Sequence, residues 1–510
     1  MSDEPELSGS RPRISTSQAA GVLVLGNVLA TLAEVIVPLV IVRLVGKGEV
    51  ATLMSLLLIY NTTSLIVLTG FPSTVTYFLP GKPRAQRAAM ARRVIGTMMM
   101  LGVVAGVLMF FIGMFGRDVL TAISSVDPSQ VTSLEPLMLV ALVPLGDLPS
   151  RVLPNLLVVE NSPRPAAGYG VLRSLGMSLS TLLPVAFGLD AWAVAGALVV
   201  LAVIELVFLQ WQLRRLYGSV PRVAATVTVG QLFRFGVPLG LTDIVSVLNH
   251  RLGAFLILST FADVAFAEYQ AGGWQIPIVT QVPYLVGAAL APRMVELFGA
   301  GKPRVAIAMW RESIGKVSLL VVPVTLVFVV AADDLVAILF TPEYARAADV
   351  LRWSALMGVG RVAAFGTVIV SAGRPRFVLQ AALLSFASNL ILALPLLWWL
   401  GFVGPAMAAF FAFIPMIIYY CWCIARASGL ALREIFPLVA YSKVLAVALV
   451  GVAGALVFRH FVDWSPVPSL LAQAAIVLGI FSALGSALGI IAREDWSFAW
   501  GWIRLKTLRH

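Results

Sequence analysis

Several charged side chains of this sequence lie inside long apolar stretches. Arg361 lies near the middle of one stretch, and Asp147 and Arg151 lie four residues apart in another, so that they share a helix face and can pair. An arginine presents a planar fork of N–H donors that binds a phosphate group through two hydrogen bonds. Arginines at such places therefore predict a binding site for an anionic group, with phosphate as the best match.

The candidate anion-binding residues come from five of these apolar stretches. They are Arg361, Arg251, Arg173, Arg151, Asn249 and Asn61. Other ionisable groups could couple a proton or sodium gradient to movement, because such groups form proton relays inside membranes. They are Asp243, His250, Glu34 and Asp147. Simpler interpretations stay open, since Asp147 and Arg151 could form a structural ion pair and His250 could be packed in the interior.

The composition places these charges in a membrane protein. The chain is 60% hydrophobic and 12% charged, whereas a soluble domain is about 25% charged. Its apolar runs are roughly twice the ~10 residues of a barrel strand, so they predict membrane-spanning helices. The net charge of +11 comes from positive residues between these runs, which indicates membrane topology and no nucleic-acid partner. No metal site or other cofactor is expected.

The predicted fold is an all-α integral membrane protein with fourteen spans. The spans are 18–42, 50–78, 94–115, 134–158, 168–188, 191–212, 230–258, 264–291, 313–330, 350–371, 377–400, 402–424, 437–458 and 467–492. We expect a cytoplasmic N-terminal tail (1–17), an N-terminal lobe (18–212), a cytoplasmic linker (213–229) and a C-terminal lobe (230–424). Two extra helices (437–492) and a cytoplasmic tail (493–510) complete the chain.

The distribution of positive charge supports this topology. When both termini and the even-numbered loops are placed in the cytoplasm, these segments hold 23 Lys and Arg residues, and the opposite loops hold 5. Cytoplasmic loops of membrane proteins carry such an excess. We therefore expect a multi-pass inner-membrane protein with both ends in the cytoplasm.

An internal repeat divides the spans into two copies of six and a final pair. The tetrapeptide Gly-Lys-Pro-Arg begins at Gly81 and again at Gly301, 220 residues later, each time after an even-numbered span. Two copies with the same orientation form a known transporter architecture, in which a cavity lies between the halves. Chance similarity between apolar segments is the alternative.

Segments in the second half carry a family resemblance. The phrases are the Pro-Arg-Met of 292–294, LFTPEYA (339–345), AADVLR (347–352), SAGRPRF (371–377) and GFVGPAMA (401–408). They resemble the bacterial polysaccharide-exporter (Wzx-type) flippases of the multidrug/oligosaccharidyl-lipid/polysaccharide (MOP) superfamily, in order over roughly residues 14–425. The stretch 41–59 also resembles the family, although Ala51 stands where a glycine is usual.

The resemblance implies a V-shaped bundle of two six-helix lobes. It implies a flippase that moves an undecaprenyl-diphosphate-linked oligosaccharide repeat unit of an O-antigen, capsule or exopolysaccharide from the cytoplasmic to the outer leaflet. Its partners would be this substrate, membrane lipids, a polysaccharide polymerase and a chain-length regulator. No site residue follows from a family motif, so the candidate residues rest on their charge and their places in the spans.

Other functions stay open at this stage. A flippase for lipid II, the peptidoglycan precursor, would share the fourteen spans. A membrane enzyme of polysaccharide assembly would need a set of catalytic groups, and the sequence brings no carboxylate pair or Ser/His set together. A cation-exporting drug pump should carry unpaired acids, whereas the arginines here are at least as numerous.

Overall fold

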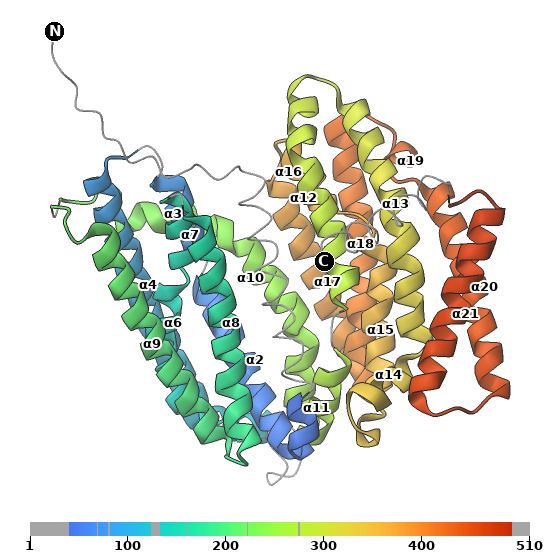
Figure 1. Cartoon of the computed structure of the whole chain (residues 1–510), viewed down its shortest axis with the longest axis horizontal. Coiled ribbons are helices and arrows are strands. Elements are labelled where there is room, and N and C mark those ends of the chain that lie inside the picture. The colour runs from blue at the N-terminus through green and yellow to red at the C-terminus, as the bar shows by residue number, and fades with distance from the viewer. Residues whose placement is uncertain are drawn as a thin grey trace, which may run out of the picture. The chain divides into compact units, whose positions relative to one another are not determined.

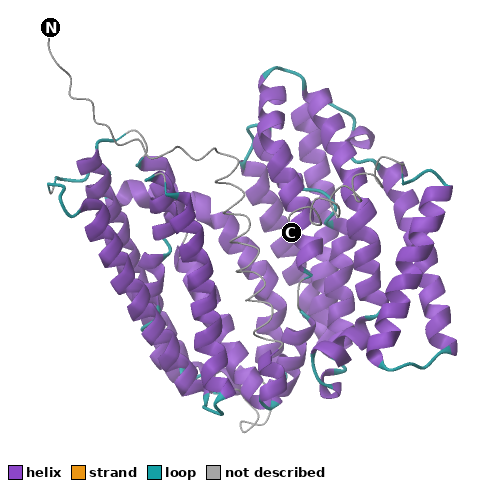
Figure 2. Cartoon of the chain, viewed as in Figure 1, coloured by secondary structure: helices purple, strands orange, loops and turns teal. Residues whose placement is uncertain are grey.

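The computed structural model describes residues 40–68, 70–79, 82–123, 133–160, 162–221, 223–273 and 276–491. Within these ranges the chain forms helices and loops and no strand (Figure 2). Glu34, the predicted tails and most of the first predicted span lie outside them. The helices form two compact units, unit 1 (Met1–Leu120 and Thr132–Ile244) and unit 2 (Thr121–Val131 and Val245–His510).

Unit 1 contains two predicted spans that are interrupted helices (Figure 1). Gly70, at the break between α2 and α3, has a φ of 65°, which only glycine adopts without strain. Between 134 and 158 the prolines Pro144, Pro149 and Pro154 each remove a backbone N–H, and three short helices replace one long one. The helices are α2 (Lys47–Leu68), α3 (Phe71–Phe78), α4 (Arg84–Ile123), α5 (Leu137–Val140), α6 (Pro144–Ser150), α7 (Leu153–Val159), α8 (Pro163–Ala186) and α9 (Ala191–Tyr217).

The helix that follows, α10 (Val229–Thr260), contains the boundary between the two units. The remaining helices belong to unit 2. They are α11 (Asp263–Gly272), α12 (Pro277–Gly299), α13 (Pro303–Val330), α14 (Ala332–Leu339), η2 (Pro342–Tyr344), α15 (Ala347–Gly360), α16 (Phe365–Ser371), α17 (Arg376–Leu400), η3 (Gly401–Val403), α18 (Gly404–Ser428), α19 (Leu432–Ile435), α20 (Leu438–Phe461) and α21 (Pro466–Ala487).

The interruptions recur at matching places in the two predicted copies. The second span of each copy is broken, between α2 and α3 and between α11 and α12. The fourth span is broken too, into α5 to α7 in the first copy and into α15 and α16 in the second. Arg361, predicted near the middle of a continuous helix, caps the C-terminus of α15 at this break. The pattern is in line with the proposed repeat.

The chain is a multi-pass membrane protein. Among the described residues, nine helical stretches are long and apolar enough to cross a membrane, and one of them, Arg376–Ser428, holds both α17 and α18. Apolar side chains point outwards on these helices, as lipid-facing side chains do; on α9, Val200, Ile204 and Val207 are each more than half exposed. The count of fourteen spans remains a prediction.

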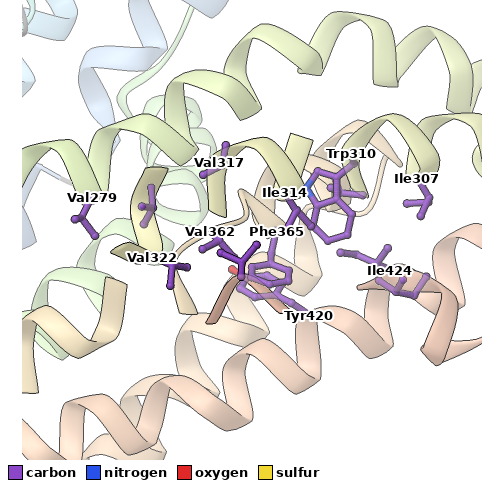
Figure 3. Packing of buried hydrophobic residues seen from close by; sticks show 14 of the residues in the cluster. Val279, Ile307, Trp310, Ile314, Val317, Val322, Val362, Phe365, Tyr420 and Ile424 are labelled. Carbon is purple, nitrogen blue, oxygen red and sulfur yellow. The ribbon is translucent and has the colours of Figure 1, made fainter. Parts of the chain in front are cut away.

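Aromatic side chains pack together where the fourth span of the second copy is interrupted, between α15 and α16 (Figure 3). Trp310 of α13 meets Phe365 edge-on, with ring centroids 5.6 Å apart, and Phe365 stacks on Tyr420 of α18 at 5.7 Å. Each such pair contributes about 0.5–1.5 kcal/mol beyond the area it buries. Because Phe365 is the first residue of α16, this packing sets where the chain resumes its helix after Arg361.

Polar contacts attach the last two helices, α20 and α21, to the rest of unit 2, and these two helices lie side by side (Figure 1). Asp334 accepts hydrogen bonds from Ser469 at 2.8 Å and from Gln473 at 2.5 Å. Asp333 pairs with Arg352 at 2.6 Å and with Arg459 at 2.7 Å. Both aspartates lie in the first turn of α14, a helix inside a segment predicted to be a loop.

Arginines in and directly after the first Gly-Lys-Pro-Arg tetrapeptide, in the segment 81–93, have structural partners. Arg84 donates to the carbonyl of Leu216 at 2.7 Å, and Arg93 donates to that of Val227 at 2.7 Å. Arg87 pairs with Glu160 at 3.0 Å. Cations favour the free carbonyls at the C-terminal end of a helix, so this segment caps α9 and holds the chain that follows it.

Candidate functional site

Five side chains from four regions of unit 1 form a buried cluster, which we call the arginine centre. They are Tyr60 of α2, Asp147 of α6, Arg151 at the end of α6, Arg173 of α8 and Glu205 of α9. The sequence predicted the pairing of Asp147 with Arg151. The structure adds Arg173, already a candidate for the anion site, to the same carboxylate.

Asp147 is the hub of the arginine centre. Its Oδ2 accepts hydrogen bonds from the Tyr60 hydroxyl at 2.7 Å and from Arg151 Nε at 2.9 Å. Its Oδ1 accepts from Arg173 Nε at 3.2 Å and from a second nitrogen of the same guanidinium. A carboxylate with this many charged and polar donors is well satisfied. Asp147 is therefore better suited to holding the arginines than to carrying a proton.

Glu205 balances the charge of the arginine centre but is poorly satisfied. Its Oε1 lies 3.5 Å from Arg173 Nε, and this buried oxygen has no hydrogen-bond partner among the described residues. With both acids ionised, the two arginines and two carboxylates sum to zero. Arg151 and Arg173 keep 15% and 24% of their side-chain surface exposed, so an added anion could reach them.

Apolar side chains lie on one side of the arginine centre. The ring of Tyr60 lines a small pocket formed by α2, α5 and α9, together with Leu53, Leu57, Val140 and Leu198. Apolar side chains lower the local dielectric constant, which strengthens the attraction between fixed charges and a bound anion. Neither Tyr60 nor Glu205 was among the predicted site residues. Glu205 was visible as an acid inside an apolar stretch, whereas nothing in the sequence distinguished Tyr60.

Gly146 sets the position of the hub. A Cβ at this residue would overlap the backbone carbonyl of Ala202 on α9, so only glycine lets α6 approach α9 this closely. Gly146→Ala is expected to push α6 outwards and lower stability by about 1–3 kcal/mol, the usual cost of overpacking. The thermal midpoint of the purified protein measures this effect. Gly168→Ala on α8 is the control, because its added Cβ would meet nothing within 4 Å, and an equal fall in both variants would contradict the prediction.

Unit 2 brings His250 and Arg361 together. His250 Nδ1 lies 2.7 Å from the carbonyl of Ser246, so it must donate, and Nε2 is left to accept from an Arg361 nitrogen at 3.3 Å. This arrangement requires the neutral ring. The Arg361 guanidinium also lies 5.7 Å from the centre of the Phe413 ring. In the described part of the chain, neither Arg361 nor Arg251 forms an ion pair.

The other candidates have varied surroundings. Asn249 donates to Ser385 Oγ at 3.0 Å and accepts from Asn389 Nδ2 at 2.9 Å, so it ties α10 to α17. Asn61 is half-buried on α2, next to Tyr60 but outside the arginine centre. Asp243 is exposed on α10 and forms no ion pair within the described residues. Glu34 lies outside those residues, and its predicted role stays a prediction.

Comparison with known proteins defines the class. A family model described as polysaccharide biosynthesis protein matches residues 40–349, more than half of the chain. The chain belongs to this family. No curated protein sequence gives a significant match.

Solved structures show the fold. A lipid II flippase, MurJ in an inward closed conformation, is 12% identical with a TM-score of 0.71, over 93% of this chain and 100% of that one. An inward-facing multidrug resistance MATE transporter of the MOP superfamily is 12% identical with a TM-score of 0.57, over 79% and 96%. A MOP superfamily transporter from Pyrococcus furiosus is 14% identical with a TM-score of 0.56, over 82% and 96%.

The chain is thus a member of the polysaccharide biosynthesis family that has the fold of the MurJ flippase and of MOP superfamily transporters. The family match confirms the resemblance that the sequence showed, and the fold is one that transporters have, as the sequence predicted.

Proposed function

We propose that this protein is a flippase that moves an undecaprenyl-diphosphate-linked oligosaccharide from the cytoplasmic to the outer leaflet of the bacterial inner membrane by alternating access. The family supports a role in polysaccharide assembly, and the fold supports transport. The observation that carries the proposal is the arginine centre, in which two guanidiniums are held deep in an apolar unit and remain partly accessible.

The chemistry of a diphosphate matches the free donors of these arginines. Arg151 and Arg173 each turn Nε and one terminal nitrogen towards Asp147, which leaves a second terminal nitrogen for another acceptor. Guanidinium groups bind phosphate oxygens through paired hydrogen bonds and stay charged when buried. The second candidate group, Arg361 and Arg251 of unit 2, offers cations that have no carboxylate partner among the described residues. Together they favour an anionic cargo over a cationic drug.

Lipid II is the second candidate cargo. The structural similarity to the lipid II flippase MurJ extends over the whole of that chain, and lipid II is also a lipid-linked diphosphate. The two cargoes share the group that the arginines would hold and differ in the sugar and its peptide. Their discrimination therefore depends on the residues that meet the headgroup.

The proposed function also includes a membrane topology, an energy source and protein partners. The excess of positive charge in the predicted cytoplasmic loops supports a topology with both termini in the cytoplasm, and a proton or sodium gradient would supply the energy. Glycan units that reach the outer leaflet must be joined there, so a polymerase and a chain-length regulator are the expected protein partners.

A leaflet-resolved assay in proteoliposomes tests the proposal. Undecaprenyl-diphosphate oligosaccharides and lipid II are loaded into the membrane, and a membrane-impermeant enzyme that cleaves the exposed sugar reports which leaflet each occupies. Protein-dependent movement of the oligosaccharide lipid, faster than that of lipid II, is expected. No movement of either lipid, with or without proton and sodium gradients, would rule out the flippase.

A further inference from the structure

Glu205 is the least satisfied charged group of the arginine centre. It is 5% exposed, and its Oε1 accepts no hydrogen bond within the described residues. The charged and titratable groups that face it come from each neighbouring element. They are Asp147 and Arg151 of the broken span, Tyr169 and Arg173 of α8, and Tyr60 of α2, reached through Asp147.

We propose that Glu205 is the proton-binding residue of the cargo site, and that it takes up a proton when Arg151 and Arg173 bind the diphosphate. The inference rests on the proposed function, because it needs an anionic cargo at these arginines. Glu205 then acts through Arg173, and its protonation state decides how much of that guanidinium's charge is available.

The contrast with Asp147 supports this division of roles. Asp147 accepts from Tyr60, Arg151 and Arg173, so protonating it would disrupt several charge-assisted hydrogen bonds. Glu205 faces one shared cation at 3.5 Å, which is longer than a charge-assisted hydrogen bond. A buried carboxylate without hydrogen bonds is costly to keep ionised. A proton entering the arginine centre therefore goes to Glu205.

The charge balance gives the reason for a proton. The empty arginine centre sums to zero, and a diphosphate joined to a lipid on one side and a sugar on the other adds two negative charges. The loaded site would then carry a charge of −2 next to apolar side chains. One proton on Glu205 reduces this to −1 and releases Arg173 from one of its two carboxylates. Binding of the proton and binding of the diphosphate thus favour each other.

This linkage has a definite sign. Below the pH at which Glu205 takes up its proton, the arginine centre carries an extra positive charge and binds the diphosphate more tightly. Above that pH, Glu205 is ionised, competes for Arg173 and weakens binding. Couplings between two sites are typically 5- to 150-fold, and we expect a loss of about tenfold in affinity between pH 5.5 and pH 8.0.

The test uses the full-length protein and geranyl-diphosphate-N-acetylglucosamine, a short probe whose doubly esterified diphosphate does not titrate in this pH range. Its affinity is measured from pH 5.5 to pH 8.0 for the wild type, for Glu205→Gln and for the exposed control Glu296→Gln. Glu205→Gln imitates the protonated acid, so it should bind tightly at every pH. The control should behave as the wild type does.

A second measurement counts protons. Calorimetry in buffers of different ionisation enthalpy should show net proton uptake when the wild type binds the probe, and none for Glu205→Gln. A wild type without uptake, or a Glu205→Gln variant with unchanged pH dependence, would overturn the role of Glu205. Absence of any binding by the wild type would instead contradict the proposed cargo, so the two failures are distinguishable.

Discussion

Asp147→Ala is expected to destabilise unit 1 by about 3–5 kcal/mol, because it removes one partner of a buried ion network and leaves the others uncompensated. Arg151 and Arg173 would lose their shared carboxylate, and Tyr60 would lose the acceptor of its hydroxyl. The thermal midpoint of the detergent-purified protein, followed by tryptophan fluorescence, measures the loss. The yield of monodisperse protein should fall with it.

The control for this variant is Glu296→Ala. Glu296 forms an ion pair of similar length, 2.8 Å, with Arg293, but both side chains are 65% exposed. Exposed pairs contribute about 0–1 kcal/mol because water screens them and their side chains must be ordered. The two variants should therefore separate clearly in their midpoints. If Asp147→Ala has the same thermal midpoint as the wild type, Asp147 is not the hub of the arginine centre.

A double variant separates lost charge balance from lost packing. In Asp147→Asn the shape is kept and the negative charge is removed, so two guanidiniums face Glu205 alone. Adding Arg173→Met removes the one excess positive charge and should restore part of the stability. If the stability loss of the double variant equals the sum of the losses of the two single variants, Asp147 and Arg173 do not interact.

Arg361→Ala is expected to lower transport at least tenfold while protein level and thermal midpoint stay near those of the wild type. The reason is the environment of Arg361, which contacts the neutral His250 ring and the Phe413 face. Within the described residues no carboxylate would be left unpaired by its removal. Transport in proteoliposomes and polymer at the cell surface measure the first effect, and the amount of protein in the membrane measures the second.

Arg361→Lys tests what the guanidinium contributes. Lysine keeps the charge but lacks the planar fork of donors that fits phosphate, so an intermediate rate is expected. Normal polymer output from Arg361→Ala would remove Arg361 from the site. Loss of the protein from the membrane would instead assign it a structural role at the end of α15.

Much of the architecture was predictable because it depends on local properties of the chain. The length of the apolar runs predicted helices that cross a membrane, and the positive residues between them predicted a topology. The spacing of Asp147 and Arg151 placed them on one helical face, and they do form an ion pair at 2.9 Å. Each of these inferences needs only hydropathy, the positions of positive charges or the helical repeat.

The breaks in the helices were only partly visible. Prolines at 144, 149 and 154 indicate an interruption around Asp147. The span was nevertheless predicted as one helix, because its apolar run continues through these prolines. No proline lies between Arg361 and Ala364, where the second break falls. That break depends on the packing of Phe365 against Trp310 and Tyr420, which come from distant parts of the chain.

The sequence by itself determined the class of protein, the apolar spans and the supply of buried arginines. Only the tertiary structure decided which other groups join the pair of Asp147 and Arg151. Asp147 binds Arg173, 26 residues away, and Tyr60, 87 residues away, and the approach of α6 to α9 at Gly146 adds Glu205. Hydropathy and helical spacing act between near neighbours, whereas these contacts depend on how separate helices pack.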